Sequence, residues 1–81
     1  MGIVYKIKIE EMTEYYSAQD GNTVLISIQP DGAAVLVMYD SLGVVFECGY
    51  YRSRKGAVNA MRRKYGRCRF HHMTQTVSRI I

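Results

Sequence analysis

Alternation of apolar and polar residues divides the first half of the chain into short segments. In residues 3–10, isoleucine and tyrosine alternate mainly with polar side chains, and a similar alternation returns in residues 23–29. Because successive side chains of a strand point to opposite faces of a sheet, both segments are predicted to be strands with one buried face. Residues 11–22 between them are polar and are predicted to form a connection, with a helical turn around residues 11–16.

Two tight turns divide the apolar stretch that follows. Pro30-Asp31-Gly32 and Asp40-Ser41-Leu42-Gly43 each end on a glycine, which takes the positive φ that closes such turns. Strands are therefore predicted over residues 33–39 and 44–51, and together with residues 23–29 they form an antiparallel meander. Residues 33–39 are apolar at nearly every position, which predicts a central strand covered on both faces.

The pattern then changes from a period of two to the helical period. Ser53 is a suitable N-cap, because its hydroxyl can accept a hydrogen bond from a free amide of the first turn. Ala57, Met61 and Tyr65 are spaced by four residues and form one apolar stripe. Gly66 stands where a left-handed C-cap would end the helix. A single amphipathic helix is predicted between Ser53 and Gly66.

The last fifteen residues are predicted to hold one more short strand. Residues 67–72 alternate again, whereas residues 74–81 are weakly patterned, with Val77, Ile80 and Ile81 available to pack against the rest. The predicted fold is α+β: a mostly antiparallel four- to five-stranded sheet with one amphipathic basic helix packed on one face. The 81 residues are predicted to form a single domain (1–81) with a small core.

Charge is distributed unequally along this plan. Residues 1–50 hold seven acidic residues against two lysines, a net charge of −5, and residues 51–81 hold nine lysines and arginines with no acid, a net charge of +9. The basic segment must find its counterions in solvent, in the acidic half of the same chain or in an external polyanion.

The predicted helix and its flanks carry most of these cations. A phosphate backbone binds several cations held on one rigid surface, because each neutralised phosphate releases counterions. A helix with an apolar back and a lysine- and arginine-rich front provides such a surface. An ordinary solvated helix face is the alternative, although such faces usually mix both signs. The residues predicted to contact phosphates are Arg52, Arg54, Lys55, Arg62, Arg63, Lys64, Arg67 and Arg69.

Aromatic residues lie among the cations. Tyr51 is predicted to stack on a base, as aromatics do in proteins that bind single strands. Tyr50 and Tyr51 are neighbours on a strand, so they face opposite sides and only one can enter the core. Tyr15 and Tyr16 in the polar connection are candidate anchors for a protein partner.

Other kinds of site are not predicted. Cys48, Cys68, His71 and His72 lack the spacing of a zinc site, and no signature groups them as a catalytic set. We therefore expect no enzyme, no metal and no cofactor. Two cysteines do not make a secreted disulfide framework, and no apolar run approaches the ~18 residues of a membrane span. A cytoplasmic location without a membrane partner is expected.

The junction between the last meander strand and the helix resembles known small domains. The segment from Gly49 to Ala57, followed by Met61 and Arg62-Arg63-Lys64, is similar to the strand-to-helix junction of the arm-site DNA-binding domains of phage tyrosine recombinases. It also resembles small bacterial domains with a Tyr-x-Ser-Lys junction and no assigned chemistry. The likeness covers under a quarter of the chain, and no functional residue is transferred from it.

Two functions follow as hypotheses. The first is a small non-enzymatic nucleic-acid-binding module, for DNA or RNA, that uses the basic helix and the flanking strands. The second is a protein-binding module, an inhibitor or adaptor of phage type, that covers an acidic or nucleic-acid-binding surface of a larger partner. Self-association into a homo-oligomer is compatible with both, because an edge strand and the opposite charges of the two halves permit contact between copies.

Overall fold

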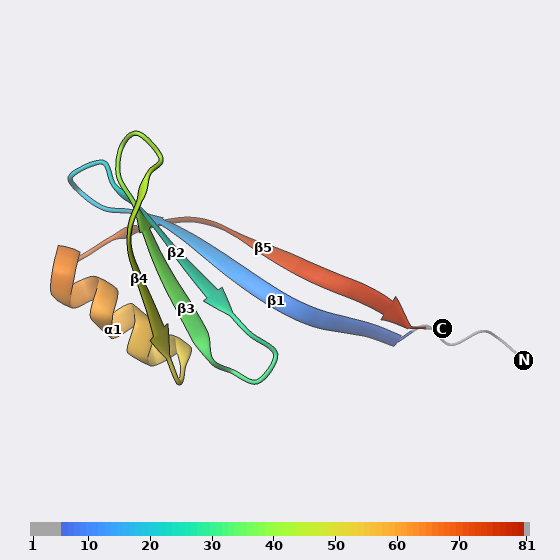
Figure 1. The fold of residues 1–81 in the computed structure, drawn as a ribbon. Helices are drawn as coiled ribbons and strands as arrows, with labels where there is room; N and C mark the ends of the chain where they lie inside the picture. The colour runs from blue at the N-terminus through green and yellow to red at the C-terminus, as the bar shows by residue number, and fades with distance from the viewer. Residues whose placement is uncertain (1–5, 81) are drawn as a thin grey trace, which may run out of the picture.

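The computed structural model describes the backbone of residues 6–80 and the side chains of residues 11–75. Five strands and one helix follow one another along the chain (Figure 1). They are β1 (Lys6–Ser17), β2 (Thr23–Ile28), β3 (Ala34–Tyr39), β4 (Val45–Tyr51), α1 (Arg54–Tyr65) and β5 (Arg69–Ile80).

The strands form one antiparallel sheet in the order β4-β3-β2-β1-β5. One helix packs against this sheet, so the predicted α+β class is confirmed. The meander of β2, β3 and β4 is confirmed to within one residue at each strand end. Both predicted turns close as expected: Gly32 donates its amide to Gln29 at 2.9 Å, and Gly43 donates to Asp40 at 3.0 Å.

The predicted polar connection over residues 11–22 is wrong over most of its length. β1 continues to Ser17, and no helical turn forms. Its second half pairs with two strands at once: Glu14 lies opposite Ile26 of β2 and Met73 of β5. Polar residues occupy this central strand because their hydrogen-bonding groups find partners there, as the buried Thr13 does with Ser27 at 3.1 Å. The first predicted strand began at Ile3, and residues 3–5 lie outside the described part.

The predicted short fifth strand is also wrong in length. β5 has twelve residues and pairs with β1 along its whole course, from Ser17 opposite Arg69 to Lys6 opposite Ile80. Since β2 pairs only with residues 12–17 of β1, the remaining part of β1 and β5 continues as a two-stranded ribbon beyond the rest of the sheet (Figure 1). Packing of Val77, Ile80 and Ile81 was predicted, and these side chains lie outside the described part.

Helix α1 has the predicted boundaries. The Ser53 hydroxyl accepts a hydrogen bond from the Gly56 amide at 3.3 Å, and Gly66, at φ 69°, donates its amide to the Arg62 carbonyl at 2.7 Å. Ala57 and Met61 are buried, so the apolar stripe of the helix faces the sheet as predicted.

The core lies between α1 and one face of the sheet. Val24, Ile26, Leu36 and Met38 occupy alternating positions of β2 and β3 and are almost fully buried. The opposite face of β3 is only partly buried, and no described helix or strand lies over it. The prediction that both faces of this strand are covered is therefore wrong. A single twelve-residue helix can cover only one side of the sheet.

Candidate nucleic-acid interface

All eight cations predicted to contact phosphates are exposed. Arg52 lies in the connection between β4 and α1, five others lie on α1, and Arg67 and Arg69 follow on the way into β5. Their availability depends on which of them pair with carboxylates of the same chain. Two of the eight form such ion pairs among the side chains that the structure describes.

Arg54 forms the more buried of these ion pairs. Its Nε and Nη2 donate to the two carboxylate oxygens of Glu14 on β1, with Nη2 2.9 Å from Oε2. The Tyr16 hydroxyl donates to the same carboxylate at 2.9 Å, and Nη2 of Arg54 donates to that hydroxyl at 3.2 Å. Arg54 thus anchors the start of α1 to the sheet through its Nε and Nη2 groups.

The protonation equilibria of this cluster reflect the same contacts. Hydrogen bonding from Arg54 holds the pKa of the Glu14 carboxyl below its ordinary value, against the opposing effect of burial. Burial, followed by the hydrogen bond to Glu14, raises the pKa of Tyr16. The hydrogen bond to Glu14 raises the pKa of Arg54. The cluster therefore carries a fixed ion pair at neutral pH.

Lys64 forms the second ion pair, at the other end of α1. Its Nζ lies 3.0 Å from Oε2 of Glu47 on β4 and 5.1 Å from the centre of the Phe46 ring. Both charged side chains are about half exposed, so water competes for each of them. Such pairs contribute little stability, about 0–1 kcal/mol, and exchange readily with another ion.

The other six cations make no ion pair with a described side chain. Lys55 and Arg62 are seven residues apart on α1, so they share a face that points away from the buried Ala57 and Met61. Arg67 and Arg69 line a hollow of about 440 Å³ together with Ser17, Ala18, Gln19 and Cys68. The basic surface that remains open consists of Arg52, Lys55, Arg62, Arg63, Arg67 and Arg69, and we call it the open basic surface.

The two tyrosines at the end of β4 lie on opposite faces of the sheet, as predicted. Tyr51 packs beside the core under α1, while Tyr50 is 85% exposed on the other face. The Tyr51 ring lies over Gly49, where a β-carbon would approach its Cε2 atom to 2.9 Å. The tyrosine predicted to stack on a base is thus the less accessible of the pair.

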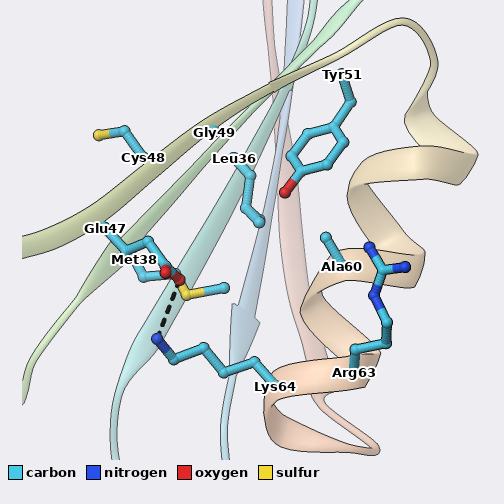
Figure 2. A pocket seen from close by; sticks show the side chains of 9 residues that line it. All are labelled: Leu36, Met38, Glu47, Cys48, Gly49, Tyr51, Ala60, Arg63 and Lys64. Atoms are coloured by element: carbon cyan, nitrogen blue, oxygen red, sulfur yellow. Dashed lines mark hydrogen bonds and ion pairs between the residues drawn. The ribbon is translucent and has the colours of Figure 1, made fainter.

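A second hollow, of about 360 Å³, lies between α1 and β4 (Figure 2). Apolar side chains of β3, Leu36 and Met38, lie at its base, and Lys64 reaches across it to Glu47. Sequence reasoning did not find this hollow, because it depends on the distance between a helix and a strand. The lining residues are Leu36, Met38, Glu47, Cys48, Gly49, Tyr51, Ala60, Arg63 and Lys64.

The cysteines and histidines are not assembled into one site. Cys48 lies on the edge strand β4, and Cys68 precedes the opposite edge strand β5; both thiols are free. His72 stacks on Tyr15 with ring centroids 4.3 Å apart, and His71 is hydrogen-bonded to Ser17. Within the described residues, no group of three or more histidine, cysteine, aspartate or glutamate side chains could hold a metal ion.

Tyr15 and Tyr16, the candidate anchors for a protein partner, lie on β1 rather than in a connection. Tyr16 is 7% exposed and contributes to the core, so it is not available to a partner. Its role in the Glu14 cluster could not be read from the sequence, because the polar pattern of residues 11–22 indicated a loop. The available signal for a strand was the β-propensity of Thr13, Tyr15 and Tyr16.

Comparison with known proteins found no matching family model, no matching curated protein and no matching solved structure. No helix of the described part is long and apolar enough to cross a membrane.

Proposed function

We propose that this protein is a small non-enzymatic module that binds nucleic acid through the phosphate backbone. The observation that carries the proposal is the open basic surface: six exposed cations that have no carboxylate partner among the described side chains. Lys55, Arg62 and Arg63 project from one rigid helix, which is anchored to the sheet by the Arg54–Glu14 ion pair.

Binding of this kind gains free energy from release of the counterions condensed on the phosphates. Contacts to phosphates position a protein on a nucleic acid without reading base identity, so we propose weak sequence preference. Arg54 acts through the position of the helix rather than as a free phosphate ligand. Lys64 can join the contacts when a phosphate replaces Glu47. Stacking by Tyr51 remains a prediction, and the exposed Tyr50 is a second candidate for that role.

The experiment is a salt series with fluorescein-labelled duplex DNA, single-stranded DNA and RNA, read by fluorescence anisotropy. For duplex DNA, the logarithm of the association constant falls with the logarithm of salt concentration by about 0.9 per phosphate contacted. The double substitution Lys55→Gln with Arg62→Gln should weaken binding to all three probes and reduce the duplex slope by about 2. An association constant that is independent of salt would refute the proposal.

A matched control is available in the same chain. The double substitution Lys6→Gln with Lys8→Gln also removes two positive charges, from the part of β1 that pairs only with β5. If binding depends on the open basic surface, this variant should keep the slope of the original protein to within about half a unit. If both double variants lose the same amount of affinity for the oligonucleotides, the protein is attracted to them by its net charge alone, and the assignment of the open basic surface is contradicted.

A second candidate function is a protein-binding module, an inhibitor or adaptor that works inside the cell. The exposed apolar side chains of β4 favour it, because Val45, Phe46 and Tyr50 are 46%, 44% and 85% exposed. Pull-down with and without nuclease distinguishes the two functions. A partner that is retained after nuclease treatment would favour this candidate.

A further inference from the structure

Strand β4 combines an unpaired edge with an adjoining groove. It is the terminal strand on its side of the sheet, so one row of its backbone amides and carbonyls has no described strand partner. The hollow of about 360 Å³ between β4 and α1 borders this edge, with apolar side chains at its base and two cations from the helix (Figure 2). An edge strand beside such a groove is a geometry in which proteins accept an extended peptide as an additional strand.

The segment Glu47–Tyr51 on the edge of β4 lacks most of the features that usually prevent strand addition. Residues 44–51 contain no lysine, arginine or proline, and their single charge, Glu47, is paired with Lys64. A bulge interrupts the pairing of β4 near Phe46, but Glu47–Tyr51 is regular. The edge strand on the other side of the sheet, β5, begins at Arg69 and carries two histidines and a bulge. The two edges of the sheet therefore differ in the basic and titratable side chains that they carry.

Charge selects the kind of segment that fits. Arg63 lines the groove, is exposed and makes no ion pair with a described side chain. Lys64 is paired with the half-exposed Glu47 and lies 5.1 Å from the centre of the Phe46 ring. A carboxylate entering the groove gains a two-point hydrogen bond from the Arg63 guanidinium, which is among the stronger polar contacts in proteins. A second copy of this chain is a poorer occupant, because it would bring a like basic helix and a net charge of +4 to the same edge.

We propose that the groove between β4 and α1 binds an extended, acidic segment of a partner protein, which adds to the sheet as a sixth strand beside Glu47–Tyr51. One apolar side chain of the segment lies over Leu36 and Met38, and an acidic side chain pairs with Arg63. This site is distinct from the open basic surface in all but Arg63, and it gives the second candidate function a location and a ligand chemistry.

The test begins with a library of random twelve-residue peptides displayed on phage and selected on the immobilised full chain. Enriched peptides should carry an apolar and an acidic residue two positions apart, because both side chains must point to the face covered by α1. Synthetic copies should slow hydrogen exchange of the backbone amides within Glu47–Tyr51. Failure to enrich any peptide that binds in solution would overturn the proposal, as would protection confined to β5.

Two neighbouring arginines provide matched variants. Arg63 lines the groove and Arg62 does not, although both are exposed residues in the last turns of α1. Arg63→Glu should lower the affinity of the protein for the selected peptides by about tenfold or more, which corresponds to about 1.4 kcal/mol of binding free energy. Arg62→Glu should change this affinity by less than about threefold. Circular dichroism checks that both variants fold.

The outcomes also separate this proposal from nucleic-acid binding. Both substitutions lie in the open basic surface, so both should weaken the binding of an oligonucleotide if that surface is correctly assigned. Equal effects of the two substitutions on the peptides would overturn the groove as their site, whatever the oligonucleotide does. A dimer of the protein alone that Arg63→Glu abolishes and Arg62→Glu preserves would show that a second copy fills the groove, and it would overturn the acidic partner.

Discussion

Arg54 and Glu14, forty residues apart in the chain, form a two-point ion pair that joins the first turn of α1 to β1, an interior strand of the sheet. The carboxylate side chain is only 10% exposed, whereas the arginine side chain is 50% exposed. The pair is therefore partly screened by water, but its acidic member has lost most of its own hydration. This contact turns one of the cations predicted to bind phosphate into a positioning residue for the others.

Removing the charge of Glu14 should destabilise the protein. In Glu14→Gln, the neutral amide cannot accept two charge-assisted hydrogen bonds from Arg54, and the Tyr16 hydroxyl loses an ionised acceptor. We expect the free energy of unfolding in urea to fall by about 1–3 kcal/mol. The control is Glu47→Gln, the same substitution in the half-exposed pair with Lys64, which should cost at most about 1 kcal/mol. Similar costs at both positions would contradict the role assigned to Glu14.

Stability should depend on pH through the same carboxyl group. Its pKa in the folded state lies below the ordinary value of 4.5, so the unfolded chain takes up the proton more readily. The stabilisation is complete above pH 4.5 and is lost as the pH falls through the folded-state pKa. Urea unfolding between pH 2.5 and 7 should show this loss in the original protein and a smaller one in Glu14→Gln. Parallel pH profiles of the two proteins would refute the assignment.

Gly49 should resist even the smallest side chain. A β-carbon at this position would lie 2.9 Å from Cε2 and 3.0 Å from the hydroxyl oxygen of Tyr51, so the ring would have to shift from its place over Gly49. We expect Gly49→Ala to reduce the free energy of unfolding by about 1–2 kcal/mol. In a Tyr51→Ala background the same substitution should be neutral or stabilising, because alanine restricts the unfolded chain more than glycine does. An equal cost in both backgrounds would argue against the contact.

The two cysteines should react with alkylating agents at different rates. Cys48 is exposed on β4, whereas Cys68 is partly buried and its pKa is raised, first by burial and then by the charge of Asp20. Since the thiolate is the reactive form, iodoacetamide at pH 8 should modify Cys48 first. Mass spectrometry of the native protein during the reaction checks the order, and urea-unfolded protein, in which the difference should vanish, is the control.

Local signals predicted the helix and the meander well. Ser53 and Gly66 fix the ends of α1 through contacts within a few residues, and the two glycine turns set the lengths of β2, β3 and β4. Such elements depend on backbone conformation and hydrogen bonds between near neighbours, so a short stretch of sequence contains the necessary information. The long strands β1 and β5 depend on pairing between residues more than fifty positions apart, and their polar residues gave no clear strand pattern.

The candidate surface was predicted in part. The cations were identified by type and by their place on the helix, and six of the eight remain open among the described side chains. The pairing of Arg54 with Glu14 was not predictable, because it requires the position of α1 relative to β1. The groove beside β4 was not predictable either, since its base and its rim come from β3 and α1.

The sequence by itself determined where the helix begins and ends, where the meander turns, and that residues 51–81 carry all their charge with one sign. Those properties follow from the conformational preferences of single residues and from a count of charges. Tertiary structure decided which cations remain open, because that depends on which carboxylate each one meets across the sheet. It also decided which strand edge is unpaired, because strand order arises from the packing of the whole chain.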